Sequence, residues 1–252
     1  MSIGFILDVT GGGATLTLNR PDKANALDLD DLRAMEAALR GLASNPDLRS
    51  LVLTGAGRHF CSGVNILAVA SDHDWTDNPI GRVADLIDSL AIPTLCAFNG
   101  EVFGGGVDLA LACDFRLGVE GMKCFAPPAR LGIQYPTGGL ERAATRLGPG
   151  GAKRLFLALE TLDAAELLRL GFLDWLVPAD QIASRAAQWA ATIAGLAPLA
   201  VQGMKRTINE AAAGRLDRAA ADARFVAGFR SADYQEGRRA MAEKRTPDFK
   251  GR

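Results

Sequence analysis

The stretch "GEVFGGGVDLALACD", from Gly100 to Asp114, joins three consecutive glycines to an apolar run that contains one acid, Asp108. The preceding "PTLCAFNG" is typical of a short buried strand, and "VDLALACD" is typical of a buried helix. The first amides of a helix have no internal partners, and glycines let a ligand approach them. Gly104–Gly106 are therefore a candidate anion or oxyanion site. A tight turn with close strand–helix packing is the alternative.

The same strand and helix rhythm continues on both sides of this stretch. "FILDV" and "ATLTLNR" predict an opening β-hairpin, and "LDLDDLRAMEAALRGLAS" has the apolar spacing of a helix. Later segments alternate in the same way until about Thr137, after which alanine-rich helices dominate. We expect an α/β fold with largely parallel strands and a C-terminal helical subdomain.

Composition and charge narrow the range of partners. The formal net charge of −1 gives no general attraction to nucleic acid or to an anionic membrane. The four cysteines lack C-x-x-C pairing and zinc-ligand spacing, which favours reduced thiols and no metal site. "MSIGFILDVT" lacks the features of a signal peptide, and no apolar run reaches the ~20 residues that cross a bilayer. We expect a cytoplasmic protein without nucleic-acid or membrane partners.

A second glycine-rich element is similar to the first. "GAGRHFCSGVNILAVA" (Gly55–Ala70) again passes from a predicted strand through small residues toward an apolar helix, with Ser62 as its expected N-cap. Val64 and Asn65 would then lie near the first turn with free amides. Two such elements could direct two N–H groups at one carbonyl oxygen, which is the geometry that stabilises an enolate.

Five motifs occur in order along the chain: "LNRPDKANAL", "FCSGVNI", "FNGEVFGGGVDLALACD", "GGLERAATRLG" and "EGRRAMAEKRTPDFKGR". Together they resemble the enoyl-CoA hydratase/isomerase family, the crotonase superfamily, over essentially the whole chain. The resemblance implies a crotonase (ClpP-like) spiral of ββα units over residues 1–195. It also implies a C-terminal helical trimerisation subdomain over residues 196–252, and a homotrimer or a dimer of trimers.

The resemblance also implies a substrate and a site. The substrates are acyl-CoA thioesters, so coenzyme A is part of the substrate and no separate cofactor is expected. By motif position, the amides of Val64 and Gly105 form an oxyanion hole and Asp108 is the catalytic acid. Substrate and CoA contacts fall on Lys23, Ala24, Ala26, Ser62, Asn65, Ile66, Gly104, Pro128 and Lys244. Arg20 adds a further cation near the CoA, and Lys244 would reach the CoA of a neighbouring subunit.

One position departs from the family pattern. Hydratases of the family use two glutamates that flank a water, and the second falls here on Pro128, which has no acid–base chemistry. Asp108 could itself be no more than an acid that favours the start of a helix. Candidate replacements for the missing acid are Glu141, Tyr135 and the Ser71–Asp77 segment with Asp72, His73, Asp74 and Asp77.

We expect an enzyme that hydrates 2-enoyl-CoA to 3-hydroxyacyl-CoA, with Asp108 as its acid–base group. Isomerisation or another crotonase-type reaction is an alternative, and a non-catalytic acyl-CoA binder is another, because of Pro128. A thiol nucleophile made of Cys61 and His59 is disfavoured, since no third group is placed to orient the histidine.

Overall fold

The computed structural model describes residues 3–69 and 74–252. Within these residues, one sheet has the strand order β1-β2-β3-β5-β7-β10 and a second has the order β4-β6-β8-β9. β1 is antiparallel to β2 and β9 to β8, whereas the other neighbours are parallel. The first sheet consists of β1 (Phe5–Thr10), β2 (Gly13–Leu18), β3 (Ser50–Gly55), β5 (Thr94–Ala97), β7 (Phe115–Val119) and β10 (Trp175–Val177). The second consists of β4 (His59–Cys61), β6 (Glu101–Phe103), β8 (Lys123–Phe125) and β9 (Leu162–Asp163).

The chain repeats one unit, in which a strand of the first sheet is followed by a strand of the second and then by a helix. This confirms the predicted α/β spiral of ββα units and its opening hairpin. The core helices are α1 (Leu29–Ala43), α2 (Pro79–Ser89), α3 (Gly106–Ala112), α4 (Thr137–Phe156), α5 (Ala164–Arg169) and α6 (Ile182–Ala194). Short 3₁₀ turns lie at η1 (Pro21–Lys23), η2 (Ile66–Ala68), η3 (Pro128–Leu131) and η4 (Ala179–Gln181).

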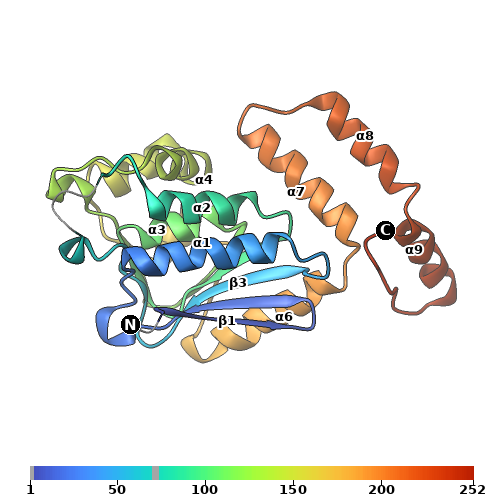
Figure 1. Cartoon of the computed structure of the whole chain (residues 1–252), viewed down its shortest axis with the longest axis horizontal. Coiled ribbons are helices and arrows are strands. Elements are labelled where there is room, and N and C mark those ends of the chain that lie inside the picture. The colour runs from blue at the N-terminus through green and yellow to red at the C-terminus, as the bar shows by residue number, and fades with distance from the viewer. Residues whose placement is uncertain (1–2, 70–73) are drawn as a thin grey trace.

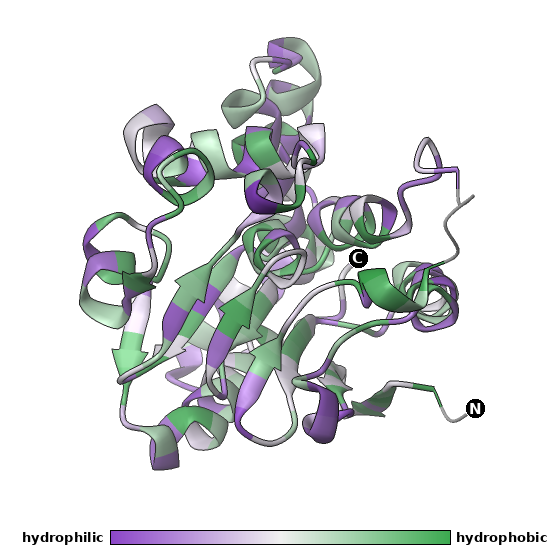
Figure 2. Ribbon diagram, turned by 90° about the vertical axis from the view of Figure 1, so that its left-hand side faces the viewer, coloured by the Kyte–Doolittle hydropathy of each residue, from purple (hydrophilic) through white to green (hydrophobic). Residues whose placement is uncertain are grey.

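The first sheet is covered on both faces, as Figure 1 shows for α1–α3 on one side and α6 on the other. Successive side chains of a strand point to opposite faces. Leu53 of β3 and Cys96 of β5 accordingly lie in the large core under α1–α3, while Val52 and Leu95 pack in a smaller core with α6. Purple and green residues share the same helices in Figure 2, as expected of helices that each bury one face.

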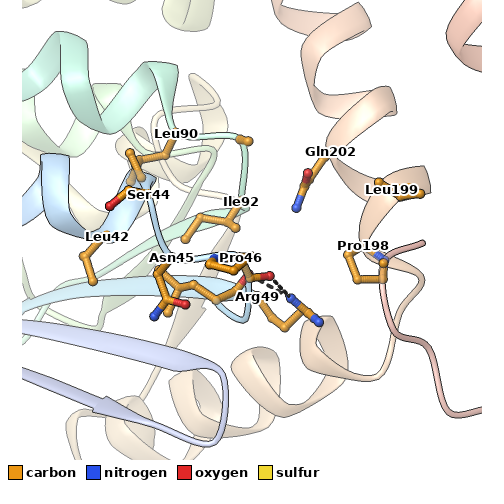
Figure 3. Close-up of a pocket in the computed structure, with 14 residues that line it drawn as sticks. Leu42, Ser44, Asn45, Pro46, Arg49, Leu90, Ile92, Pro198, Leu199 and Gln202 are labelled. Carbon is orange, nitrogen blue, oxygen red and sulfur yellow. Dashed lines mark hydrogen bonds between the residues drawn. The ribbon is translucent and has the colours of Figure 1, made fainter.

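Three further helices, α7 (Pro198–Ala212), α8 (Arg218–Gly228) and α9 (Ala232–Glu243), extend to one side of this core in Figure 1. Lys205 of α7 ties them to it, since its Nζ lies 2.7 Å from Asp114 Oδ2 and donates to the Ile92 carbonyl at 2.8 Å. A hollow of about 320 Å³ lies between α7 and the core, with Pro198, Leu199 and Gln202 facing it from the helix (Figure 3). None of the described helices is long and apolar enough to span a membrane.

A buried arginine joins strand β7 to its surroundings. Arg116 is 1% exposed and donates to the carbonyls of Cys113, at 2.7 Å, and Phe172. Its Nη2 also lies 3.2 Å from a carboxylate oxygen of Asp174. The end of α3 and the segment that leads into β10 are therefore both attached to one guanidinium, which fixes the position of the helix that begins with the glycines.

Replacing Arg116 by Met should lower the free energy of unfolding by about 3 kcal/mol, because the carbonyls of Cys113 and Phe172 and the carboxylate of Asp174 lose the guanidinium as a donor. Urea denaturation measures the change. Arg33→Met is the matched control, since Arg33 is 59% exposed and its ion pair is with the exposed Asp30. This substitution should change stability by less than about 0.5 kcal/mol. Equal effects of the two substitutions would contradict this account of Arg116.

Candidate functional site

The two glycine-rich elements meet at the ends of neighbouring strands. β4 and β6 are parallel, with His59 opposite Glu101, so the residues that follow each strand emerge at the same edge. Gly63 follows β4 and has a φ of +88°, and a Cβ built on it would lie 2.5 Å from the amide nitrogen of Gly105. Only glycine fits at this position, both for its backbone conformation and for the space available. The chain segments on either side of Val64 and Gly105 are thus in direct contact.

Two amides at this junction have no partner in the part of the chain that the structure describes. Among the described residues, the N–H groups of Val64 and Gly105 donate no hydrogen bond, whereas the amide of Gly104 donates to the Phe125 carbonyl at 3.0 Å. Gly105 is the N-cap residue of α3, where an unpaired amide is expected. The two predicted oxyanion donors therefore lie on contacting segments, and no described residue accepts from their N–H groups.

The prediction of an α-helix after Ser62 is wrong. The structure has only the 3₁₀ turn η2 between Val64 and Val69, and Ser62 caps no helix. A long-range pairing prevents the helix. Leu27 forms a parallel bridge with Val64, and the Leu27 carbonyl accepts the amide of Asn65 at 2.9 Å. That bond also corrects the expectation of a free Asn65 amide. Of the pair Val64 and Asn65, Val64 is the one whose N–H has no partner among the described residues.

Asp108 lies in the first turn of α3 and is 1% exposed. Its Oδ1 accepts from Nε of Arg142 on α4 at 2.9 Å, and Nη1 of the same guanidinium lies 2.8 Å from Asp85 of α2. Oδ2 of Asp108 is buried and has no hydrogen-bond partner among the described residues. Burial raises the pKa of Asp108 to about 6, while the charge of Arg142 opposes part of that rise. The site thus holds a carboxylate with one oxygen paired to Arg142 and the other without a partner in the described part of the chain.

Arg142 was not identified from the sequence, although it lies inside the "GGLERAATRLG" motif. The buried residues Gly139, Ala143 and Leu147 mark the inner face of α4, and Arg142 borders that face. A Cβ on Gly139 would lie 3.0 Å from the Asp108 carboxylate, so α4 and α3 are in close contact here. Helical spacing could have placed Arg142 near the core, but not opposite Asp108, because that depends on how α3 and α4 pack.

The predicted CoA loop packs against the same edge. Ala24 and Asn25 both have positive φ, and the Ala24 carbonyl accepts the amide of Ser62 at 2.9 Å. The buried Asn25 side chain donates to backbone carbonyls of the 56–60 turn. Asn65 Nδ2 donates to Asp28 at 2.9 Å. The structure therefore brings together Lys23, Ala24, Ala26, Ser62, Asn65 and Ile66, with the Lys23 side chain exposed.

Two cationic residues that were predicted near the CoA, Arg20 and Lys244, do not face the site within one chain. Arg20 is 17% exposed and forms ion pairs with Asp28, at 2.7 Å, and Asp31, so it holds the loop onto α1 rather than facing a ligand freely. Lys244 is exposed and is the C-cap residue of α9. Helix α9 lies at the opposite end of the molecule from α1 (Figure 1). Within one chain, Lys244 is not part of the site.

Pro128 and the residues predicted as replacements for the missing second acid have the following positions. Pro128 is buried at the start of η3, three residues after the Phe125 carbonyl that accepts the Gly104 amide. Glu141 points to solvent from α4, and the Tyr135 hydroxyl donates to the Gly104 carbonyl at 2.9 Å. Of the Ser71–Asp77 segment, Asp72 and His73 lie outside the described residues, Asp74 accepts from Thr76, and Asp77 pairs with Arg82.

The cysteines show no sign of a nucleophile. All four are free and buried, as expected from the sequence. Burial raises the pKa of Cys61 to about 12, and its thiol lies 3.4 Å from the Asn25 carbonyl that accepts from it. A thiol held in the neutral form does not attack a thioester, because the thiolate is the nucleophile. His59 instead lies 3.4 Å from Glu101 on the neighbouring strand.

Comparison with known proteins agrees with this geometry. The chain is 32% identical to a crotonyl-CoA hydratase of Syntrophomonas wolfei, over 94% of each chain, and 34% identical to a carnitinyl-CoA dehydratase of Proteus mirabilis, over the whole of both. It superposes on an enoyl-CoA hydratase of Bacillus anthracis with a TM-score of 0.90 and 28% identity, covering 99% of this chain and all of the other. The model of the enoyl-CoA hydratase/isomerase family matches residues 9–252, so the chain belongs to that family.

Proposed function

We propose that this protein is an enoyl-CoA hydratase, which adds water across the 2,3-double bond of an acyl-CoA thioester. The observation that carries the proposal is the pair of amides of Val64 and Gly105, which lie on contacting segments and have no partner among the described residues. The buried Asp108 lies one helical turn from Gly105. Relatives named as hydratases over nearly the whole chain support hydration over isomerisation. Coenzyme A enters as part of the substrate, and the proposal needs no other cofactor.

The two amides act on the thioester oxygen. Both N–H groups donate to it, and they bind it more strongly as it gains negative charge, so they lower the barrier to an enolate. One such donor is typically worth ~3 kcal/mol of barrier. The same polarisation makes C3 of the enoyl group electrophilic, which prepares that carbon for attack by water.

Asp108 supplies the proton transfers. Its carboxylate takes a proton from water as the oxygen bonds to C3, and the double-bond electrons move to form the enolate. The resulting carboxylic acid then returns a proton to C2, so that one water is added in total. A pKa of about 6 leaves the group mostly ionised at pH 7 and still able to donate. Because Pro128 replaces the second acid, we expect a slower enzyme than one with two carboxylates.

The binding of CoA and the assembly state belong to the same proposal. Lys23, Ala24 and Ala26 would hold the CoA beside Val64, and Lys244 would reach it from another copy in a homotrimer or a dimer of trimers. Several apolar side chains of the C-terminal helices support such an assembly, because they are 45–83% exposed in a single chain: Leu199, Met204, Ile208, Phe225, Val226, Phe229 and Met241.

Asp108→Asn should lower kcat for hydration of crotonyl-CoA by about 10²- to 10⁴-fold, because the amide cannot accept the proton of water. Loss of absorbance of the conjugated thioester measures the rate. Glu141→Gln is the matched control, since it removes an exposed carboxylate from α4, and its rate should equal that of the wild type. An unchanged rate in Asp108→Asn would refute the assigned role, and a loss in Glu141→Gln would favour the alternative acid.

The pH dependence follows from the charges around Asp108. kcat/KM should fall as the pH drops through about 6, because protonation removes the base. Arg142 favours the ionised carboxylate, so Arg142→Met should move this acid limb upward by about one pH unit or more. Arg146→Met, one turn along α4, should leave the limb within a few tenths of a unit. A limb that moves equally in both variants, or in neither, would contradict the pairing of Arg142 with Asp108.

Phe225→Asp should dissociate the assembly, because it places a charge where a 68% exposed aromatic side chain would be covered by another copy. Light scattering coupled to size exclusion should give a mass of three or six times 26.6 kDa for the wild type and a smaller assembly for the variant. Leu157→Asp, which alters a 72% exposed side chain after α4, is the control. A monomeric wild type would refute the proposed assembly.

A further inference from the structure

Tyr135 is buried behind the site and reaches one particular backbone atom. Its residue is 7% exposed, and its hydroxyl donates to the Gly104 carbonyl at 2.9 Å. The ring is held by the Phe156 ring, with centroids 4.5 Å apart, and a Cβ on Gly139 would lie only 2.7 Å from the ring. The hydroxyl therefore has little freedom to leave this carbonyl.

The carbonyl of Gly104 and the amide of Gly105 belong to the same peptide group. That group is planar and trans, so its C=O and its N–H point in opposite directions. A hydrogen bond that fixes the direction of the carbonyl therefore fixes the direction of the Gly105 N–H. Donation to the carbonyl also polarises the peptide group, which makes the N–H a stronger donor.

The backbone around Gly104 leaves this peptide in need of such support. Gly104 has a φ of +51°. Glycine adopts positive and negative φ about equally readily, so sterics alone do not fix the backbone of Gly104 in this conformation. The N–H of Gly104 is fixed by the Phe125 carbonyl, and its own carbonyl receives the Val107 amide at 3.2 Å, at the upper end of the usual range. The Tyr135 hydroxyl gives the shorter of the two bonds to that carbonyl.

We infer that Tyr135 is a positioning residue that orients and polarises the Gly104–Gly105 peptide, so that the Gly105 amide stabilises the thioester oxyanion. The phenol is a reliable donor, because burial and the Asp108 carboxylate raise the pKa of Tyr135 well above its ordinary value and keep the proton in place. The inference rests on the proposed function, since it assigns a role within the same oxyanion site.

Tyr135→Phe tests the inference, because it removes the hydroxyl and keeps the ring. We expect kcat for crotonyl-CoA to fall about 3- to 10-fold with KM changed less than twofold. The reason is that the hydrogen bond from the Gly105 amide to the thioester oxygen strengthens mainly in the transition state. The second readout is the infrared stretch of the ¹³C-labelled thioester carbonyl of bound butyryl-CoA, which cannot be hydrated. It should shift to lower wavenumber in the wild type and shift less in the variant.

The control is Tyr234→Phe, the same change at the other tyrosine of the chain, which is 38% exposed on α9. It should alter neither kcat nor the carbonyl stretch. A folded Tyr135→Phe with wild-type kcat and a wild-type stretch would overturn the inference. If the wild type shifts the carbonyl stretch of butyryl-CoA but does not turn over crotonyl-CoA, the proposed hydration is overturned. The role of Tyr135 is then decided by whether Tyr135→Phe reduces that shift. Absence of butyryl-CoA binding, or binding without a shift in the wild type, overturns the inference.

If Tyr135→Phe does not fold, the acidity of the Tyr135 hydroxyl can be changed instead while the ring is kept. In the Tyr234→Phe background, Tyr135 is the single tyrosine of the chain, so 3-fluorotyrosine incorporated during expression alters that phenol alone. The fluorinated phenol is more acidic and a stronger donor. We expect a larger carbonyl shift and a higher kcat than with ordinary tyrosine, and unchanged values of both would overturn the inference.

Discussion

The site depends on a backbone contact in which no side chain fits. A Cβ on Gly63 would lie 2.5 Å from the Gly105 nitrogen, and a Cβ on Gly106 would lie 2.8 Å from both the carbonyl oxygen and the Cβ of Cys61. Both distances are shorter than packed atoms tolerate, so the two loops can approach this closely only as glycines. The parallel pairing of β4 with β6 brings the loops to the same edge, and the glycines then allow them to touch.

Charge at this junction is balanced inside the protein. Burial disfavours the ionised form of Asp108, and Arg142 recovers part of that loss by pairing with one carboxylate oxygen. Asp85, whose side chain is 66% exposed, pairs with the same guanidinium from the solvent side. The result is a buried acid whose pKa lies near 6 and whose second oxygen has no protein partner among the described residues. This combination suits a group that must both accept and return a proton near neutral pH.

The sequence was informative wherever a feature depends on nearby residues. The hairpin, the alternation of strands and helices and the buried helix after Gly104–Gly106 follow from local apolar spacing. The spiral of ββα units was implied by the motif resemblance, which also places Val64 and Gly105 where their amides have no partner among the described residues. The helix expected after Ser62 failed because Leu27, far earlier in the chain, takes up the amide of Asn65. A local pattern does not contain that pairing.

The same limit applies to the side chains around Asp108. Arg142 is 34 residues away and reaches the carboxylate because α4 packs on α3, and Arg20 is taken up by Asp28 and Asp31 because the loop folds back on α1. Tyr135 could be named from the sequence as a candidate acid, but its bond to the Gly104 carbonyl gives it a different role. In each case the residue type was visible and its partner was set by tertiary packing.

A crystal structure with bound butyryl-CoA tests the central claim most directly. The account predicts that the thioester oxygen lies about 2.7–3.1 Å from both the Val64 and the Gly105 nitrogens, with the acyl C2 and C3 facing Oδ2 of Asp108. A thioester oxygen that contacts neither amide, or an acyl-CoA bound instead in the hollow between α7 and the core, would contradict it.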